Sequence, residues 1–211
     1  MMERGRNLAL STLIALYTSL FVLAPIMSNR LVEIGSFKIV LGGLFAAVAA
    51  AFLDVINNNW GMIKARETVL ASLIVRFTTY ALIFATVMFI PVVREPAGFQ
   101  DIIVSALRML FAAEIAGVLS QYFIDIPLFD WMKKKFKHIF IMRYNISNVF
   151  SQLIQGVTFC YIAFYGTDKA HLIPHIIVGG FVLKFACQVG LSPVMAALAH
   201  WTKPQDVSDT R

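Results

Sequence analysis

Six ionisable residues interrupt the long hydrophobic stretches of this 211-residue chain. A charge near the centre of a membrane helix costs roughly 2.5 to 3.5 kcal/mol on insertion scales, so such groups face one another, a polar cavity or the interface. These residues are Asp54, Arg76, Arg108, Glu114, Asp125 and Lys184. We therefore expect the chain to bind or move something polar inside a membrane.

Amide side chains accompany these charges at helical spacing. Asn145, Asn148, Gln152 and Gln155 are separated by 3, 4 and 3 positions, which places them on one face of a helix. Asn and Gln offer both a donor and an acceptor, so they suit a flat heterocycle with mixed edges better than a simple ion. Hydrogen bonding between helices is the alternative role of each amide.

The composition indicates an all-α integral membrane protein. Hydrophobic residues make up 59% of the chain, charged residues 14%, and the mean hydropathy is +0.75, whereas soluble domains carry about 25% charged residues. A helix of about 20 residues spans a hydrocarbon core of about 30 Å. We predict one transmembrane domain over residues 1–211, a bundle of six helices near 8–27, 38–55, 69–92, 102–123, 146–165 and 173–201.

The basic residues predict the orientation. With a cytoplasmic amino terminus, eleven Lys and Arg residues fall in the cytoplasmic segments and four in the opposite ones. Cytoplasmic loops of membrane proteins carry the excess of Lys and Arg. Both termini are therefore expected in the cytoplasm. The basic run from Trp131 to His138 fits a cytoplasmic loop beside anionic lipid better than a nucleic-acid site.

Several kinds of chemistry have no signature in the chain. The four histidines, His138, His171, His175 and His200, show no metal-ligand spacing. There is no phosphate-binding loop and no Ser-His-Asp arrangement of known spacing. We expect no cofactor, no metal, no nucleic-acid partner and no enzymatic activity.

A series of short motifs resembles the vitamin uptake transporter family, also called queuosine-precursor transporters. Asp54-Val-Ile-Asn57 leads to Trp60-Gly61 and then Ala65-Arg66, similar to the family's Asp-x-x-Asn-Glu-x-Tyr-Gly and Ala-Arg elements. Further matches follow in family order, namely Ser28-Asn29-Arg30, Arg108, Ser120-Gln121, Asp125, Phe129, Ser151-Gln152, Ala163 to Gly166, Lys184 and Pro193. The chain departs from the pattern at Asn58, Trp60 and Gln155, where the family has Glu, Tyr and Asp.

This resemblance implies a multi-pass protein of the bacterial cytoplasmic (inner) membrane that imports 7-deazaguanine precursors of queuosine, a modified tRNA base. The substrate-binding residues expected on this basis are Asn29, Asp54, Asn57, Gln121, Asp125, Asn148, Gln152 and Lys184. Trp60 or Phe159 could stack on the base, and Lys184 could also pair with Asp54 or Asp125. We expect Arg108 and Glu114 to form a structural ion pair.

Two other functions stay open at this stage. The chain could be the substrate-binding membrane subunit of a multi-component vitamin importer, energised by an ATPase partner that contacts small-residue runs such as Gly42-Gly43 and Ala46 to Ala51. An integral membrane enzyme acting on lipid is the other alternative. The preferred precursor, the energy coupling and a homo-oligomeric state do not follow from these residues.

Overall fold

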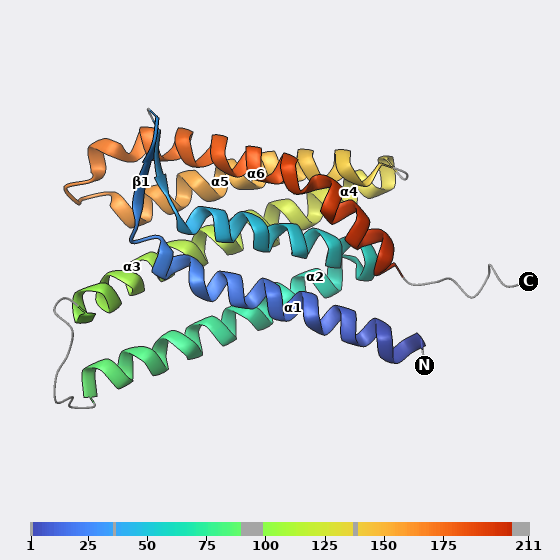
Figure 1. Ribbon diagram of the computed structural model, residues 1–211, viewed down its shortest axis with the longest axis horizontal. Helices are drawn as coiled ribbons and strands as arrows, with labels where there is room; N and C mark the ends of the chain where they lie inside the picture. Colours follow the sequence, from blue (N-terminus) through green and yellow to red (C-terminus); the bar gives the residue numbers. More distant parts are fainter. Residues whose placement is uncertain (1, 36, 90–98, 137–138, 204–211) are drawn as a thin grey trace, which may run out of the picture.

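Helices make up nearly all of the structure, and one short hairpin interrupts them. The computed structural model describes residues 2–35, 37–89, 99–136 and 139–203. In chain order the elements are α1 (Met2–Met27), β1 (Leu31–Ile34), β2 (Phe37–Val40), α2 (Gly42–Phe89), α3 (Phe99–Gly117), the π-helix η1 (Val118–Asp125), α4 (Ile126–Lys135), α5 (Phe140–Phe164), the 3-10 helix η2 (Ala170–Leu172) and α6 (Ile173–Trp201). Figure 1 shows their arrangement as a bundle.

Four helical segments of the described chain are long and apolar enough to cross a membrane. They are Asn7–Met27, Gly42–Phe89, Ile103–Lys135 and Ala170–Trp201. The predicted all-α membrane character is therefore confirmed. The count of six spans stays a prediction, because α5 carries too many polar residues to join this set and α2 contains two of the predicted spans.

Helix α2 is 48 residues long and bends at Gly61, where φ is 86° and ψ is 171°. A straight helix of that length would extend about 72 Å, far more than a bilayer thickness. Glycine adopts a positive φ without the steric cost that a Cβ would impose. The bend divides α2 into two segments that each match a predicted span, except that 90–92 lie outside the described residues.

The second predicted span begins later than expected. Residues Phe37–Val40 form β2 and pair antiparallel with β1, with Leu31 opposite Val40 and Ile34 opposite Phe37. The predicted start at Lys38 is therefore wrong, and the helix starts at Gly42. Apolar and β-branched residues on both sides of Gly35, which has a positive φ of 60°, favour a hairpin over a helix.

The two ends of the bundle differ in charge. Figure 1 shows the beginning of α1, the bend of α2, the end of α4, the beginning of α5 and the end of α6 at one end. The hairpin, the end of α2, the beginning of α3 and the α5–α6 connection lie at the other end. Basic residues of the first end include Lys64, Arg66, Lys133, Lys134 and Lys135. This common end is what the predicted orientation requires; the orientation itself stays a prediction.

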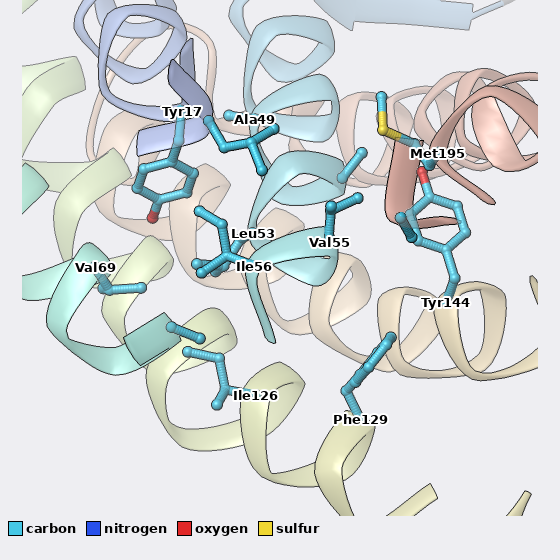
Figure 2. Packing of buried hydrophobic residues seen from close by; sticks show 14 of the residues in the cluster. Tyr17, Ala49, Leu53, Val55, Ile56, Val69, Ile126, Phe129, Tyr144 and Met195 are labelled. Carbon is cyan, nitrogen blue, oxygen red and sulfur yellow. The ribbon is translucent and has the colours of Figure 1, made fainter. Parts of the chain in front are cut away.

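The largest apolar cluster joins five helices around the first half of α2. Tyr17 of α1, Leu53 and Ile56 of α2, Phe129 of α4 and Tyr144 of α5 are all fully or almost fully buried there, as Figure 2 shows. The aliphatic and aromatic side chains of this cluster pack closely, and their many van der Waals contacts together stabilise it. The cluster holds α2, α4 and α5 in the register that places their polar residues.

Candidate functional site

A pocket lies between α5 and α6, closed on its other sides by α1, α2, α3 and β2. We call it the α5–α6 pocket. Its cavity volume is about 60 Å³. The lining residues are Phe21, Ala24, Ser28, Val40, Gly42, Gly43, Ala46, Ala113, Gln152, Gln155, Gly156, Phe159, Cys160, Ile176, Ile177, Gly180, Phe181 and Lys184. No Asp or Glu is among them.

One face of α5 supplies most of the polar wall. Gln152, Gln155 and Phe159 are separated by 3 and 4 positions, the spacing that keeps side chains on one side of a helix, and Cys160 follows Phe159. The four amides predicted to lie on one face of this helix are thus in two different surroundings. Gln152 and Gln155 reach the pocket, whereas Asn145 bonds to Ser192 and Asn148 contacts Asp54.

Lys184 of α6 is the only cationic residue of the pocket lining. Its ammonium donates to Gln155 Oε1 at 3.2 Å. Among the described residues no carboxylate lies within ion-pair distance of it, so the expected pairing with Asp54 or Asp125 is wrong. The Lys184 stem passes over Gly43, where an added Cβ would lie 2.9 Å from Lys184 Cε. The glycine therefore leaves the space that the lysine occupies.

Gln152 is held by a neighbouring amide and keeps a free acceptor. Its Nε2 donates to Gln188 Oε1 at 2.8 Å, and Gln188 Nε2 donates to the Tyr144 carbonyl at 3.1 Å. The Gln152 Oε1 atom is buried without a hydrogen-bond partner. A buried acceptor without a partner is costly, so this oxygen is available to a ligand donor.

Aromatic rings form the apolar part of the wall. Phe21, Phe159 and Phe181 line the pocket, and Phe159 packs edge-on against Phe164 with a centroid distance of 6.1 Å. Phe159, one of the two rings expected to stack on a base, thus lines the pocket. Trp60 is not, because it packs against the apolar cluster around α2.

The remaining predicted binding residues lie outside this pocket. Asp54 and Asn148 contact each other deep between α2 and α5, and Asp125 lies beside Asp54. Asn57 donates to the Ile126 carbonyl at 3.2 Å, which ties α2 to α4. Gln121 accepts from the Tyr17 hydroxyl at 2.6 Å. The structure therefore brings only Gln152 and Lys184 of the eight predicted residues to the α5–α6 pocket.

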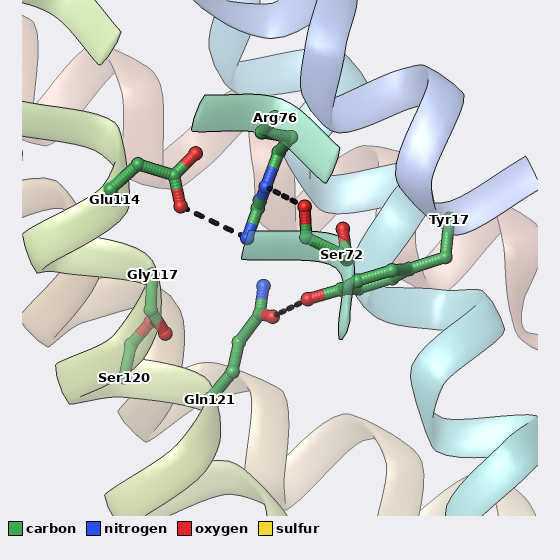
Figure 3. Close-up of polar contacts among 7 residues, drawn as sticks. All are labelled: Tyr17, Ser72, Arg76, Glu114, Gly117, Ser120 and Gln121. Carbon is green, nitrogen blue, oxygen red and sulfur yellow. Dashed lines mark hydrogen bonds and ion pairs between the residues drawn. The ribbon is translucent and has the colours of Figure 1, made fainter. Parts of the chain in front are cut away.

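The predicted ion pair between Arg108 and Glu114 is wrong. Arg76 Nη2 lies 2.9 Å from Glu114 Oε2, and both side chains are buried, as Figure 3 shows beside the Tyr17–Gln121 bond. Arg76 also lies over the Phe21 ring, with its guanidinium carbon 4.6 Å from the centroid. Arg108 and Glu114 are six positions apart, about 120° around the helix axis, so they cannot face the same neighbour.

Asn29 and Arg108 meet instead at a second hollow near the hairpin end. This hollow is more open, has a volume of about 610 Å³, and is lined also by Asp168 and Lys169. Arg108 is exposed there. The hollow adjoins the α5–α6 pocket along α5, where Cys160 lines the pocket and Ala163 lines the hollow.

Some residues of the site were not predicted as ligands. Gln155, Ser28 and Phe181 line the pocket, and Gln188 positions Gln152. The helical spacing of Gln155 with Gln152 and of Gln188 with Lys184 was the signal available for two of them. Nothing in the local sequence distinguishes Phe181 from the other aromatic residues of a membrane helix.

Comparison with known proteins identifies the family. Residues 40–198 match the model of the family described as "Putative vitamin uptake transporter". No curated protein and no solved structure matches the chain. The matched range includes Gln152, Lys184, Asp54 and Asp125. The chain, with its several apolar helices, therefore belongs to the vitamin uptake transporter family and is a multi-pass membrane protein.

Proposed function

We propose that this protein imports a 7-deazaguanine precursor of queuosine and that the α5–α6 pocket binds it. The observation that carries the proposal is the composition of the pocket wall. A free amide acceptor of Gln152, the Lys184 ammonium and the rings of Phe159 and Phe181 share one pocket that contains no carboxylate among its lining residues.

This combination suits the edge and the faces of a deazaguanine. The base has a keto oxygen that accepts a hydrogen bond, which Lys184 Nζ can donate. Its ring N–H and exocyclic amino group are donors, which Gln152 Oε1 can accept. Its two faces are flat and apolar, so they fit against Phe159 or Phe181.

The charge of Lys184 favours a neutral base over a cationic one. The aminomethyl precursor carries an ammonium group, whereas the cyano precursor and the free base do not. Since no acidic side chain lines the pocket, a cationic ligand would place two positive charges together in a medium of low dielectric constant. The neutral precursors are therefore the proposed substrates.

The bacterial cytoplasmic membrane is the proposed location, with both termini and the basic end of the bundle in the cytoplasm. The α5–α6 pocket lies toward the hairpin end, because β2, the end of α5 and the beginning of α6 line it. In this orientation the pocket is nearer to the outer side, as expected for an importer that is ready to receive its substrate.

An uptake assay in bacteria that cannot synthesise queuosine tests the proposal, with queuosine in their tRNA as the readout. Wild-type protein is expected to restore the modification when the cyano precursor is supplied at low concentration. Gln152→Ala and Lys184→Met are expected to reduce uptake at least tenfold, the effect of about 1.4 kcal/mol. Lys134→Met is the matched control, since Lys134 is exposed and pairs with Asp130. Wild-type protein that is inserted in the membrane but restores no queuosine would overturn the proposal.

A further inference from the structure

Two carboxyl groups lie together in the interior, away from the α5–α6 pocket. Asp54 belongs to α2 and Asp125 is the last residue of the π-helix η1. Both are buried, with relative exposures of 1% and 0%. Their side chains lie close enough to interact, and the Ser147 and Ser151 side chains of α5 lie beside Asp125. We call these two residues the carboxyl pair.

The surroundings of the carboxyl pair supply neutral donors rather than cations. Asn148 donates a hydrogen bond to Asp54 Oδ2, and the groups beside Asp125 are the uncharged hydroxyls of Ser147 and Ser151. No basic side chain of the described residues is within ion-pair distance of either carboxyl group. Buried carboxylates without such partners repel each other, so the two groups do not both ionise.

The other titratable groups that interact with the carboxyl pair are uncharged at neutral pH. Among the described residues they are Tyr17 of α1, which interacts with Asp125, and Tyr144 of α5, which interacts with both carboxyl groups. The basic side chains of the α4–α5 end are bound elsewhere: Lys133 Nζ donates to the Asn58 carbonyl and Arg143 Nη2 to Asn58 Oδ1. Binding of one proton to the carboxyl pair is therefore the simplest way to remove one of its two negative charges.

A continuous hydrogen-bonded path connects the carboxyl pair to the pocket. Asn148 Nδ2 contacts Asp54 and also donates to the Tyr144 carbonyl at 2.8 Å. The same carbonyl accepts from Gln188 Nε2, and Gln188 Oε1 accepts from Gln152 Nε2 in the pocket wall. Every side chain of this path is buried. A ligand that moves Gln152 therefore changes the hydrogen bonds of a path that ends at Asp54.

The helix that carries Asp125 also has an unusual backbone. Helix η1 runs over Val118–Asp125 with π-helical bonding between two α-helical segments. Such insertions are rare and occur frequently at functional sites, because they displace one residue from the regular register. Here the insertion ends at Asp125 and leaves its carboxyl group facing Asp54.

We propose that Asp54 and Asp125 form a proton-binding site that couples import to the proton gradient, with one proton carried per solute. This inference rests on the proposed function. The pair takes up a proton from the outer side while the pocket binds its solute. It releases the proton to the cytoplasm after the solute has left, and the Gln152–Gln188–Tyr144–Asn148 path connects the two events.

Infrared spectroscopy of the purified protein tests the proton site without any substrate. At neutral pH the wild-type protein is expected to show the C=O stretching band of a protonated carboxylic acid. The band should disappear in Asp125→Asn and in Asp54→Asn and persist in the control Asp130→Asn, whose native carboxylate pairs with Lys134. Absence of the band in the wild-type protein, or its persistence in both pair variants, overturns the proton site.

Transport in proteoliposomes then tests the coupling, with the membrane potential held at zero. In the absence of a gradient the wild-type protein should exchange labelled cyano precursor across the membrane. With the outside more acidic by 2 pH units, it should accumulate the precursor up to about 100-fold, the limit for one proton per solute. Asp125→Asn is expected to exchange the precursor but to lose the accumulation, whereas Asp130→Asn should retain it.

The outcomes separate the two proposals. A wild-type protein that exchanges the precursor but does not accumulate it, or that accumulates it only with a sodium gradient, overturns proton coupling and leaves the proposed function standing. A wild-type protein that shows the infrared band but exchanges no precursor overturns the proposed substrate instead, while the band still supports the proton site.

Discussion

Gln152 of α5 and Gln188 of α6 form a hydrogen bond of 2.8 Å between the Nε2 atom of the first and the Oε1 atom of the second. This bond joins the two helices that supply most of the pocket. It also determines which way the Gln152 amide faces, because the donor side is used and the acceptor Oε1 is left without a partner. An amide that is oriented in this way presents its acceptor Oε1 to a ligand and keeps one further N–H of Nε2.

Removal of Gln188 should weaken solute binding without a contact to the solute. In Gln188→Ala the Gln152 amide is free to turn, and a buried hydrogen bond of roughly 1 to 2 kcal/mol is lost. We expect the half-saturating concentration of precursor to rise about 5- to 30-fold, measured by initial uptake rates. Val189→Ala is the control, because the neighbouring Val189 is exposed. An unchanged half-saturating concentration in Gln188→Ala would show that the bond does not orient Gln152 for binding.

Gly43 should be needed for the position of Lys184. A methyl group at residue 43 would lie 2.9 Å from Lys184 Cε, which forces the flexible lysine stem to move. We expect Gly43→Ala to raise the half-saturating precursor concentration about tenfold while the protein remains folded, since a side-chain end can shift. Gly190→Ala is the matched control on α6, because an added Cβ there meets nothing within 4 Å. Equal effects of the two changes would contradict this account.

The Arg76–Glu114 pair should matter for stability. Breaking a buried ion pair leaves one charge uncompensated and costs about 3 to 5 kcal/mol. We expect Glu114→Ala to lower the free energy of unfolding in detergent by that amount, and the double variant Arg76→Met with Glu114→Leu to recover most of it. A double-mutant cycle should give a coupling energy for Arg76 with Glu114 and none for Arg108 with Glu114. Coupling to Arg108 would restore the pairing that the structure excludes.

Cysteine labelling should establish the orientation of the bundle. Lys134 lies at the basic end and Lys169 lines the hollow near the hairpin end. In whole cells a membrane-impermeant thiol reagent is expected to label Lys169→Cys and not Lys134→Cys, in a background without Cys160 and Cys187. Disrupted cells should allow both to react. The reverse pattern in whole cells would invert the proposed orientation and place the pocket nearer to the cytoplasm.

The periodicity of the sequence was sufficient to predict several features of the molecule. Long apolar runs require helices in a membrane, because a helix satisfies its own backbone hydrogen bonds. The spacing of Asn145, Asn148, Gln152 and Gln155 placed four amides on one face of α5, and all four make the polar contacts described above. The order of short motifs indicated the family, which the match over residues 40–198 confirms.

Tertiary structure alone decided which of these faces meet. Helical spacing relates residues of one helix and contains no information about the rotation or depth of its neighbour. For this reason Arg76, on a different helix, is the partner of Glu114. For the same reason Asp54 and Asp125, which are 71 positions apart, form a pair away from the pocket that contains Gln152 and Lys184. The chain by itself determined which polar groups enter the bundle, whereas the packing of the helices separated them into a solute pocket and a carboxyl pair.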